Sequence, residues 1–363
     1  MKKNKNYVDL KDQPVPEGQH LLEVDDLKMY FHTEDGVVRA VDGVSYTLDR
    51  GETLGVVGES GSGKSVTAMT IMGLISMPPG KIEGGDVRYR GRSILEMTEE
   101  EMQHIRGNDI AMIFQDPMTS LNPVYKIGKQ VGEGLRLHRG YSKQEALKRA
   151  TELLDLVGIP EPEKRVNEYP HQFSGGMRQR VMIAMALACD PDILIADEPT
   201  TALDVTIQAQ IIELMKEMQE KNGNAIIMIT HDLGVVADMA DKIMVMYAGR
   251  PVEFGTAEEI FYESRHPYTW GLIRSIPEQA IDEKKPLTPI HGNPPSLMNL
   301  PEGCVFSPRC PYATDKCRKQ RPERVVTESG HYSACHYSGD PEFLKNAPET
   351  SRTRKDSKKG GEA

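Results

Sequence analysis

Short, wholly apolar segments alternate along the chain with longer segments whose apolar residues recur every three or four positions. The apolar segments are typical of buried strands, and the periodic segments are typical of helices packed on them. Their alternation predicts an α/β fold, a parallel sheet covered by helices on both faces. The expected strands span residues 52–57, 110–114, 193–196 and 225–229, and the expected helices span residues 65–75, 143–157, 177–187 and 206–221.

Two segments of a different kind precede this pattern. Residues 21–31 and 37–48 alternate apolar and polar positions on either side of Asp35-Gly36, a dipeptide typical of tight turns. They predict an antiparallel β-subdomain. Residues 1–20 are charged and contain proline, and we expect a flexible N-terminal tail.

The chain changes character again after Gly255. Two short helical segments, 257–263 and 268–275, lead into a proline-rich region and then to four clustered cysteines. We expect residues 256–340 to form a loop-rich extension. Residues 341–363 are polar with a basic run, which predicts a disordered tail.

Composition narrows the function classes. The 363 residues include 44 Lys and Arg against 54 Asp and Glu, a formal net charge of −10. Counterion release on nucleic acid needs a basic surface, so we expect no nucleic-acid partner. No apolar run reaches the roughly 18–20 residues of a spanning helix, and no apolar run follows the basic start as in a secretory signal. We therefore expect a cytosolic protein.

A glycine-rich loop lies between the first buried strand and the helix that follows it. The segment fits G-x-x-x-x-G-K-[ST] in the strand–loop–helix context that this motif requires. Glycines let the backbone fold around phosphates, and the N–H groups of the loop and helix N-terminus bind the anion. Lys64 is expected to contact the β- and γ-phosphates, and Ser65 is expected to bind Mg²⁺. The loop consists of Gly58, Glu59, Ser60, Gly61, Ser62, Gly63, Lys64 and Ser65.

Two adjacent carboxylates, Asp197 and Glu198, follow the apolar strand 193–196. Asp197 suits outer-sphere coordination of Mg²⁺, and Glu198 can orient or deprotonate an attacking water. An acidic pair after a strand is often merely solvated. Together with the phosphate loop, however, it predicts a nucleotide-hydrolysing site.

A third motif begins just before the predicted helix 177–187. Ser174 and the backbone of Gly175 and Gly176 can form a second anion site at that helix N-terminus. With this motif in place, residues 21–255 resemble the ATP-binding subunits of ABC transporters. The family signature is here preceded by Phe173 in place of Leu and carries Met177 in place of the usual Gln.

The resemblance implies a fold, cofactors and a mechanism. The fold is a P-loop NTPase with a RecA-like core, an antiparallel β-subdomain and a helical signature subdomain at about residues 117–178. The cofactors are ATP and Mg²⁺. Two such domains close face to face, so that residues 174–177 of one grip the γ-phosphate of the ATP held by the phosphate loop of the other.

The resemblance also assigns roles to single residues. Gln115 matches the glutamine that touches Mg²⁺ and the water, and His231 matches the histidine that hydrogen-bonds the γ-phosphate and the catalytic glutamate. Asp204 matches the loop that communicates across the dimer, although a helix N-cap is an alternative role. Phe31 matches the aromatic residue that stacks on adenine, with Tyr30 beside it as a second candidate.

Residues 114–123, 173–187 and 266–269 resemble one branch of the family, the D-type ATPases of bacterial oligopeptide and dipeptide importers. This implies an ATPase that powers peptide import from the cytoplasmic face of the cell membrane. Its partners are an F-type second ATPase subunit in a heterodimer, two transmembrane permease subunits and an extracytoplasmic peptide-binding protein.

Two alternatives remain open. The same machine can import nickel, glutathione or another small solute, because specificity lies in the other subunits. A soluble ABC ATPase acting in DNA repair is a rival of another class. Such proteins often insert long coiled coils between phosphate loop and signature, whereas the interval here holds a compact helical subdomain.

Four of the five cysteines are clustered. In a cytosolic protein such a cluster favours a metal site over disulfides. Four thiolates hold either tetrahedral Zn²⁺ or a [4Fe–4S] cluster, and the spacing does not decide between them. ATPases of the peptide-importer branch carry a C-terminal iron–sulfur motif, so the resemblance favours [4Fe–4S]. The four expected ligands are Cys304, Cys310, Cys317 and Cys335. The fifth cysteine, Cys189, is expected to be a small core residue.

Overall fold

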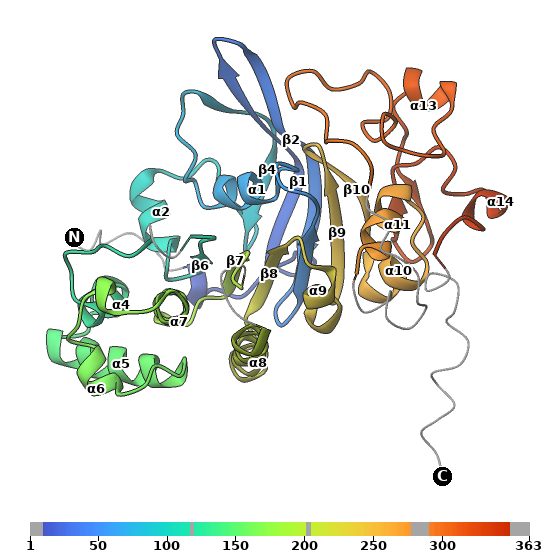
Figure 1. Cartoon of the computed structure of the whole chain (residues 1–363). Coiled ribbons are helices and arrows are strands. Elements are labelled where there is room, and N and C mark those ends of the chain that lie inside the picture. Colours follow the sequence, from blue (N-terminus) through green and yellow to red (C-terminus); the bar gives the residue numbers. More distant parts are fainter. Residues whose placement is uncertain (1–9, 117–119, 201–204, 277–289, 349–363) are drawn as a thin grey trace.

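The structure is a computed structural model that describes residues 10–116, 120–200, 205–276 and 290–348. The chain forms two sheets with helices around them (Figure 1). The helical subdomain lies at one end of the larger sheet, and the C-terminal extension lies at the other (Figure 1). Asp204 and residues 117–119 lie outside the described residues.

The larger sheet has eight strands in the order β11-β12-β10-β9-β3-β8-β7-β6. From β9 to β6 the neighbours are parallel, as predicted. The strands β10, β12 and β11 continue the sheet with antiparallel pairing. The four predicted strands are β3 (Thr53–Val57), β6 (Ile110–Ile113), β7 (Ile193–Asp197) and β8 (Ala225–Thr230). The strands not predicted are β9 (Lys242–Tyr247), β10 (Arg250–Thr256), β11 (Val325–Val326) and β12 (Tyr332–Ser333).

Helices cover this sheet on both faces. The helix after the phosphate loop stops at Ile71, earlier than predicted, because Gly73 adopts a left-handed backbone with φ 61°. The other helices predicted in this part of the chain are found within two residues of their expected bounds, and α9 is an addition that packs on β3 and β8. The helices are α1 (Lys64–Ile71), α7 (Gly175–Leu187), α8 (Val205–Asn222) and α9 (Leu233–Met239).

The antiparallel β-subdomain is larger than predicted. β1 (Leu22–Thr33) and β2 (Gly36–Leu48) pair as expected, with Thr33 opposite Gly36. They share a four-stranded sheet, β2-β1-β4-β5, with β4 (Gly80–Tyr89) and β5 (Arg92–Ser93). Gly84-Gly85 interrupts the apolar alternation of β4, which hides it from sequence inspection. A shared core joins this sheet to the parallel one, and α2 (Glu99–Ile105) packs beside it.

The helical subdomain packs against α7. The predicted helix 143–157 is α5, which begins at a capping box formed by Ser142 and Glu145. Its apolar face joins a core that also contains Cys189, which is 2% exposed, so the prediction for that residue is confirmed. The helices are α4 (Ile127–His138), α5 (Lys143–Leu156) and α6 (Pro162–Arg165), followed by the 3-10 helix η2 (Pro170–Gln172).

The C-terminal extension folds onto the larger sheet. β12 pairs with β10, so that Glu253 lies opposite Ser333. Val305 and Phe306 enter a core cluster with residues of β9, α9 and α10. The helices of this region are α10 (Ala257–Tyr262), α11 (Pro267–Arg274), α13 (Asp315–Lys319) and α14 (Pro341–Leu344).

The structure corrects the two predicted tails where it describes them. Leu10, in the 3-10 helix η1 (Leu10–Asp12), is 4% exposed and belongs to a core cluster. The ring of Phe343 in α14 packs 5.3 Å from that of Trp270 and 5.4 Å from that of Tyr337. Val15 also packs on the core near Leu10, and Ala347, after α14, is 5% exposed. A few apolar residues hardly change the local composition on which the prediction rests.

The centre of the sheet leaves no room for a side chain at Gly55. A Cβ there would lie 2.3 Å from Val236 Cγ1 in α9, which is completely buried. We expect Gly55→Ala to lower the free energy of unfolding by about 1–3 kcal/mol in thermal unfolding of the purified chain. Gly84→Ala is the matched control, because its Cβ would meet nothing closer than Lys28 Cδ at 3.7 Å. A Gly55→Ala protein as stable as this control would contradict the packing.

Candidate functional site

Parallel pairing brings the predicted residues to one edge of the sheet. Val57, at the end of β3, is in register with Thr230 at the end of β8. Asp197 at the end of β7 is in register with Ile229, and β6 ends beside β7. The phosphate loop, the acidic pair, His231 and Gln115 all follow these strand ends. Ligands of open α/β sheets bind at this carboxyl edge.

The phosphate loop is fixed at its two ends and open at its tip. Gly58 and Gly63 have φ of 153° and 101°, and a Cβ at either position would lie within 2.3 Å of a backbone oxygen. Both positions therefore require glycine. Ser60 and Gly61 at the tip are exposed. The N–H groups of the tip are thus accessible to an anion.

Lys64 is folded back onto its own loop. Its side chain is buried, and Nζ donates to the Gly58 carbonyl at 2.7 Å and to the Glu59 carbonyl at 3.1 Å. Burial lowers the pKa of Lys64, although the carboxylates of Glu198, Asp197 and Glu59 act in the opposite direction.

Ser65 and Asp197 are in direct contact. Ser65 Oγ donates to Asp197 Oδ1 at 3.0 Å, and burial raises the pKa of Asp197. A hydroxyl and a carboxylate together are the oxygen ligands that Mg²⁺ prefers. These two side chains from different elements therefore fit a magnesium site.

Glu198 points away from Asp197 because its backbone is left-handed, with φ 47°. This conformation is held by a hydrogen bond from Glu198 N to the carbonyl of Ile229, 2.8 Å long. Its carboxylate meets Gln115 Nε2 at 3.0 Å and His231 Nδ1 at 3.3 Å. Left-handed non-glycine residues cost of order 1–3 kcal/mol and cluster at functional sites.

The signature segment forms the N-terminus of α7. Ser174 caps the helix by accepting a hydrogen bond from Met177 N, and Ser174 and Gly175 are exposed. Gln179 in the same helix donates to the carbonyl of Pro199, the residue after Glu198, at 2.6 Å. Helix α7 therefore carries the exposed anion site at its N-terminus and contacts the residue after the acidic pair through Gln179.

The two aromatic candidates differ in their surroundings. Phe31 is half-buried and packs against the core cluster of the β-subdomain. The hydroxyl of Tyr30 donates to Asp42 at 2.9 Å, and Asp42 also pairs with Arg250. Tyr30 is therefore engaged in a polar network, which leaves Phe31 as the aromatic candidate.

The four clustered cysteines line one cavity together with Phe306, Tyr312 and Phe343. Burial raises the pKa of Cys310 to about 11 and that of Cys335 to about 12. Across the part of the chain that the structure describes, no group of three or more His, Cys, Asp or Glu side chains is arranged to hold a metal. The structure gathers the predicted ligands around one space without forming the predicted metal site.

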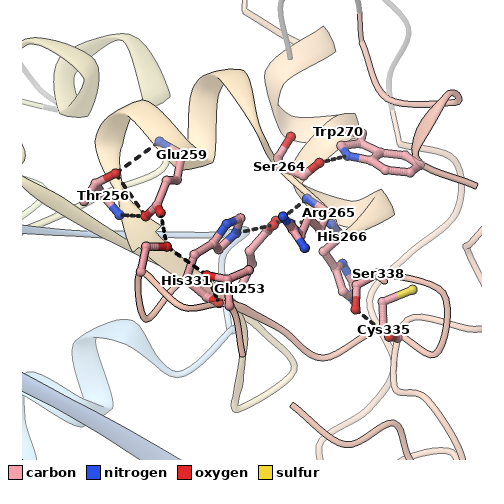
Figure 2. A network of polar contacts seen from close by, with 12 residues as sticks. Glu253, Thr256, Glu259, Ser264, Arg265, His266, Trp270, His331, Cys335 and Ser338 are labelled. Atoms are coloured by element: carbon pink, nitrogen blue, oxygen red, sulfur yellow. Dashed lines mark hydrogen bonds and ion pairs between the residues drawn. The ribbon is translucent and has the colours of Figure 1, made fainter. Parts of the chain in front are cut away.

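A buried carboxylate anchors the extension (Figure 2). Glu253 in β10 is completely buried and accepts hydrogen bonds from the backbone N–H groups of Arg265 and His266. Its third partner is His331 Nε2 at 3.0 Å, just before β12. Burial lowers the pKa of His266 to about 4.

Two residues of the extension that the motifs did not reveal contact the phosphate loop. The hydroxyl of Tyr268 accepts a hydrogen bond from Glu59 N at 2.9 Å, and Arg309 forms an ion pair with the Glu59 carboxylate. Residues so far apart along the chain give no local signal of this contact.

None of the helices in the described ranges is long and apolar enough to cross a membrane.

Residues 41–201 match the family model described as "ABC transporter", and residues 252–317 match "Oligopeptide/dipeptide transporter, C-terminal region". The dimeric ATP-binding cassette MJ0796, bound to ADP and Pi, superimposes with a TM-score of 0.60 at 29% identity, covering 65% of this chain and 98% of that one.

Curated relatives match most of the chain. The oligopeptide transport ATP-binding protein OppD of Bacillus subtilis is 58% identical over 86% of this chain and 87% of its own length. The dipeptide transport ATP-binding protein DppD of Escherichia coli is 52% identical over 88% of this chain and 97% of its own. The predicted family and P-loop NTPase fold are therefore confirmed, and the chain belongs to the ATP-binding subunits of ABC transporters, in the oligopeptide and dipeptide branch.

Proposed function

We propose that the chain hydrolyses ATP at the carboxyl edge of β3, β6, β7 and β8 and thereby powers peptide import. Family membership makes it an ATPase subunit of a membrane transporter, peripheral on the cytoplasmic face. The observation that carries the assignment of the site is the carboxylate of Glu198. Gln115 and His231 hold it beside the contacting pair Ser65 and Asp197.

Each residue at this edge has a role in the proposal. Lys64 exchanges its two loop carbonyls for the β- and γ-phosphates, and the N–H groups at the loop tip and at the N-terminus of α1 bind the remaining phosphate oxygens. Ser65, Asp197 and Gln115 would hold Mg²⁺, which would supply positive charge to balance the negative charge that develops on the phosphates. Gln115 would also contact the attacking water.

Glu198 is the general base in this scheme. Its carboxylate is held by Gln115 and His231, where it can take a proton from water. His231 is 59% exposed, so its ring is accessible to a γ-phosphate. It then hydrogen-bonds that phosphate and keeps Glu198 in place.

The second half of the site comes from a partner ATPase. Ser174, Gly175, Gly176 and Met177 lie at an exposed helix N-terminus, which favours binding of the γ-phosphate held by the other subunit. Asp204, which follows the acidic pair in the sequence, is proposed to communicate across this interface. Phe31 stacks on the adenine ring.

The transported solute and the remaining partners follow from the relatives. OppD and DppD are named for oligopeptide and dipeptide transport, which favours peptides over nickel, glutathione or another solute. The proposed assembly pairs this chain with an F-type ATPase, two permease subunits and an extracytoplasmic peptide-binding protein.

The extension is proposed to hold a [4Fe–4S] cluster on Cys304, Cys310, Cys317 and Cys335. A common cavity lined by all four thiols supports this assignment. Zn²⁺ is the alternative occupant of the same four thiolates.

Glu198→Gln tests the general base. We expect the assembled transporter with this change to bind MgATP normally and to lose about 10²- to 10⁴-fold in hydrolysis rate, because the amide cannot accept the proton. Glu213→Gln, at an exposed position of α8, is the matched control. Hydrolysis by Glu198→Gln at the control rate would refute the assignment.

Copurification tests the assembly. A tagged chain expressed with its neighbouring genes should retain a second, different ATPase and two membrane proteins in detergent. Recovery of two copies of this chain with the permeases, and no second ATPase, would contradict the heterodimer.

Anaerobic purification tests the cluster. We expect a coloured protein with a broad visible absorption band, containing iron and acid-labile sulfide, and we expect Cys310→Ser to lose them. Cys189→Ser is the control, since Cys189 lies in the core of the helical subdomain and should leave the spectrum unchanged. A colourless protein containing zinc would contradict the iron–sulfur proposal.

A further inference from the structure

The C-terminal extension reaches the phosphate loop at one residue, Glu59, and holds it by both backbone and side chain. Tyr268 accepts a hydrogen bond from the backbone N–H of Glu59 at 2.9 Å. Arg309 binds the carboxylate with two nitrogens, Nη1 to Oε2 at 2.5 Å and Nη2 to Oε1 at 3.0 Å. Such parallel two-point pairs are among the strongest and most directional polar contacts in proteins.

Arg309 is held in place by a full set of acceptors. Its side chain is 4% exposed, and Nε donates to the carbonyl of His291 at 2.9 Å. The terminal nitrogens also meet the carbonyl of Ile290 and the hydroxyl of Tyr247. The guanidinium is a permanent positive charge, and it lies against the Glu59 carboxylate.

The turn that carries Arg309 is itself packed. Within it, Arg309 N and Cys310 N donate to the carbonyl of Phe306. The ring of Phe306 lies 5.2 Å from that of Tyr247 and 5.4 Å from that of Tyr268. One aromatic cluster thus positions both side chains that touch Glu59.

The charge of Glu59 matters to this site because it acts on Lys64. An unpaired carboxylate in the loop would repel the phosphates of ATP, and low exposure would strengthen that repulsion. Arg309 supplies the compensating charge from outside the loop. The cationic balance of the loop therefore depends on a residue of the extension.

We propose that Arg309 is a positioning residue for ATP: it neutralises Glu59 and holds it in place, and the extension thereby sets the affinity of the phosphate loop for nucleotide. The proposal rests on the assignment of residues 58–65 as the ATP site. It does not depend on which metal the cysteines bind.

The test measures MgATP binding to the purified full-length chain and the ATPase rate of the assembled transporter. Arg309→Gln should weaken MgATP binding by roughly tenfold and raise KM more than it lowers kcat. Glu59→Gln should bind MgATP more tightly than Arg309→Gln does, because it removes the repelling charge. The double variant should return to within about threefold of the unchanged chain.

Arg318→Gln is the matched control, because Arg318 pairs with Asp315 at 3.0 Å on the exposed surface of the same extension. Thermal unfolding of every variant verifies folding, and Glu59→Gln keeps the test valid if Arg309→Gln does not fold. Unchanged affinity in Arg309→Gln, binding by Glu59→Gln no tighter than that by Arg309→Gln, or a double variant as weak as Arg309→Gln would each overturn the proposal. Lys64→Ala distinguishes an error in the ATP-site assignment from an error in the inference about Arg309. Normal MgATP binding by Lys64→Ala would mean that the ATP site is misassigned. Loss of MgATP binding by Lys64→Ala, together with unchanged binding by Arg309→Gln, would overturn only the inference about Arg309.

Discussion

The parallel hydrogen bonding of β3, β8, β7 and β6 is the constraint on which the site depends. Because the strands run in one direction and are in register, their carboxyl ends lie side by side. Residues far apart along the chain therefore meet: Ser65 meets Asp197 across 132 positions, and Gln115 meets Glu198 across 83. A slip of β7 by one residue would turn Asp197 to the other face of the sheet and remove its contact with Ser65.

Charge at this edge is balanced by groups from three parts of the chain. Lys64 is buried among the carboxylates of Glu59, Asp197 and Glu198 and is held by loop carbonyls. ATP brings further negative charge to a site that already holds three carboxylates. Binding therefore needs cations from elsewhere, which Mg²⁺ at Ser65 and Asp197 and the guanidinium of Arg309 at Glu59 would supply.

Local motifs could be predicted because strand, loop and helix follow each other without interruption. The phosphate loop and the acidic pair are of this kind, and their surroundings in the structure agree with the pattern. β4 was missed because Gly84-Gly85 resembles a turn, although pairing with β1 on one side keeps the strand extended. Leu10 and Phe343 were missed because each anchors its segment by tertiary packing alone, which leaves little trace in the neighbouring residues.

The contact between Arg309 and Glu59 belongs to a further class, since neither residue carries a local signal of the other. Three anchors of the extension explain how Arg309 reaches Glu59. β12 adds to the sheet edge at β10, Glu253 gathers His331 and two backbone N–H groups, and Phe306 enters the aromatic cluster beneath the loop. A segment anchored by sheet pairing, a buried carboxylate and packed rings has little freedom to shift alone. The contact with Glu59 therefore joins the phosphate loop to the same anchored segment that lines the cysteine cavity.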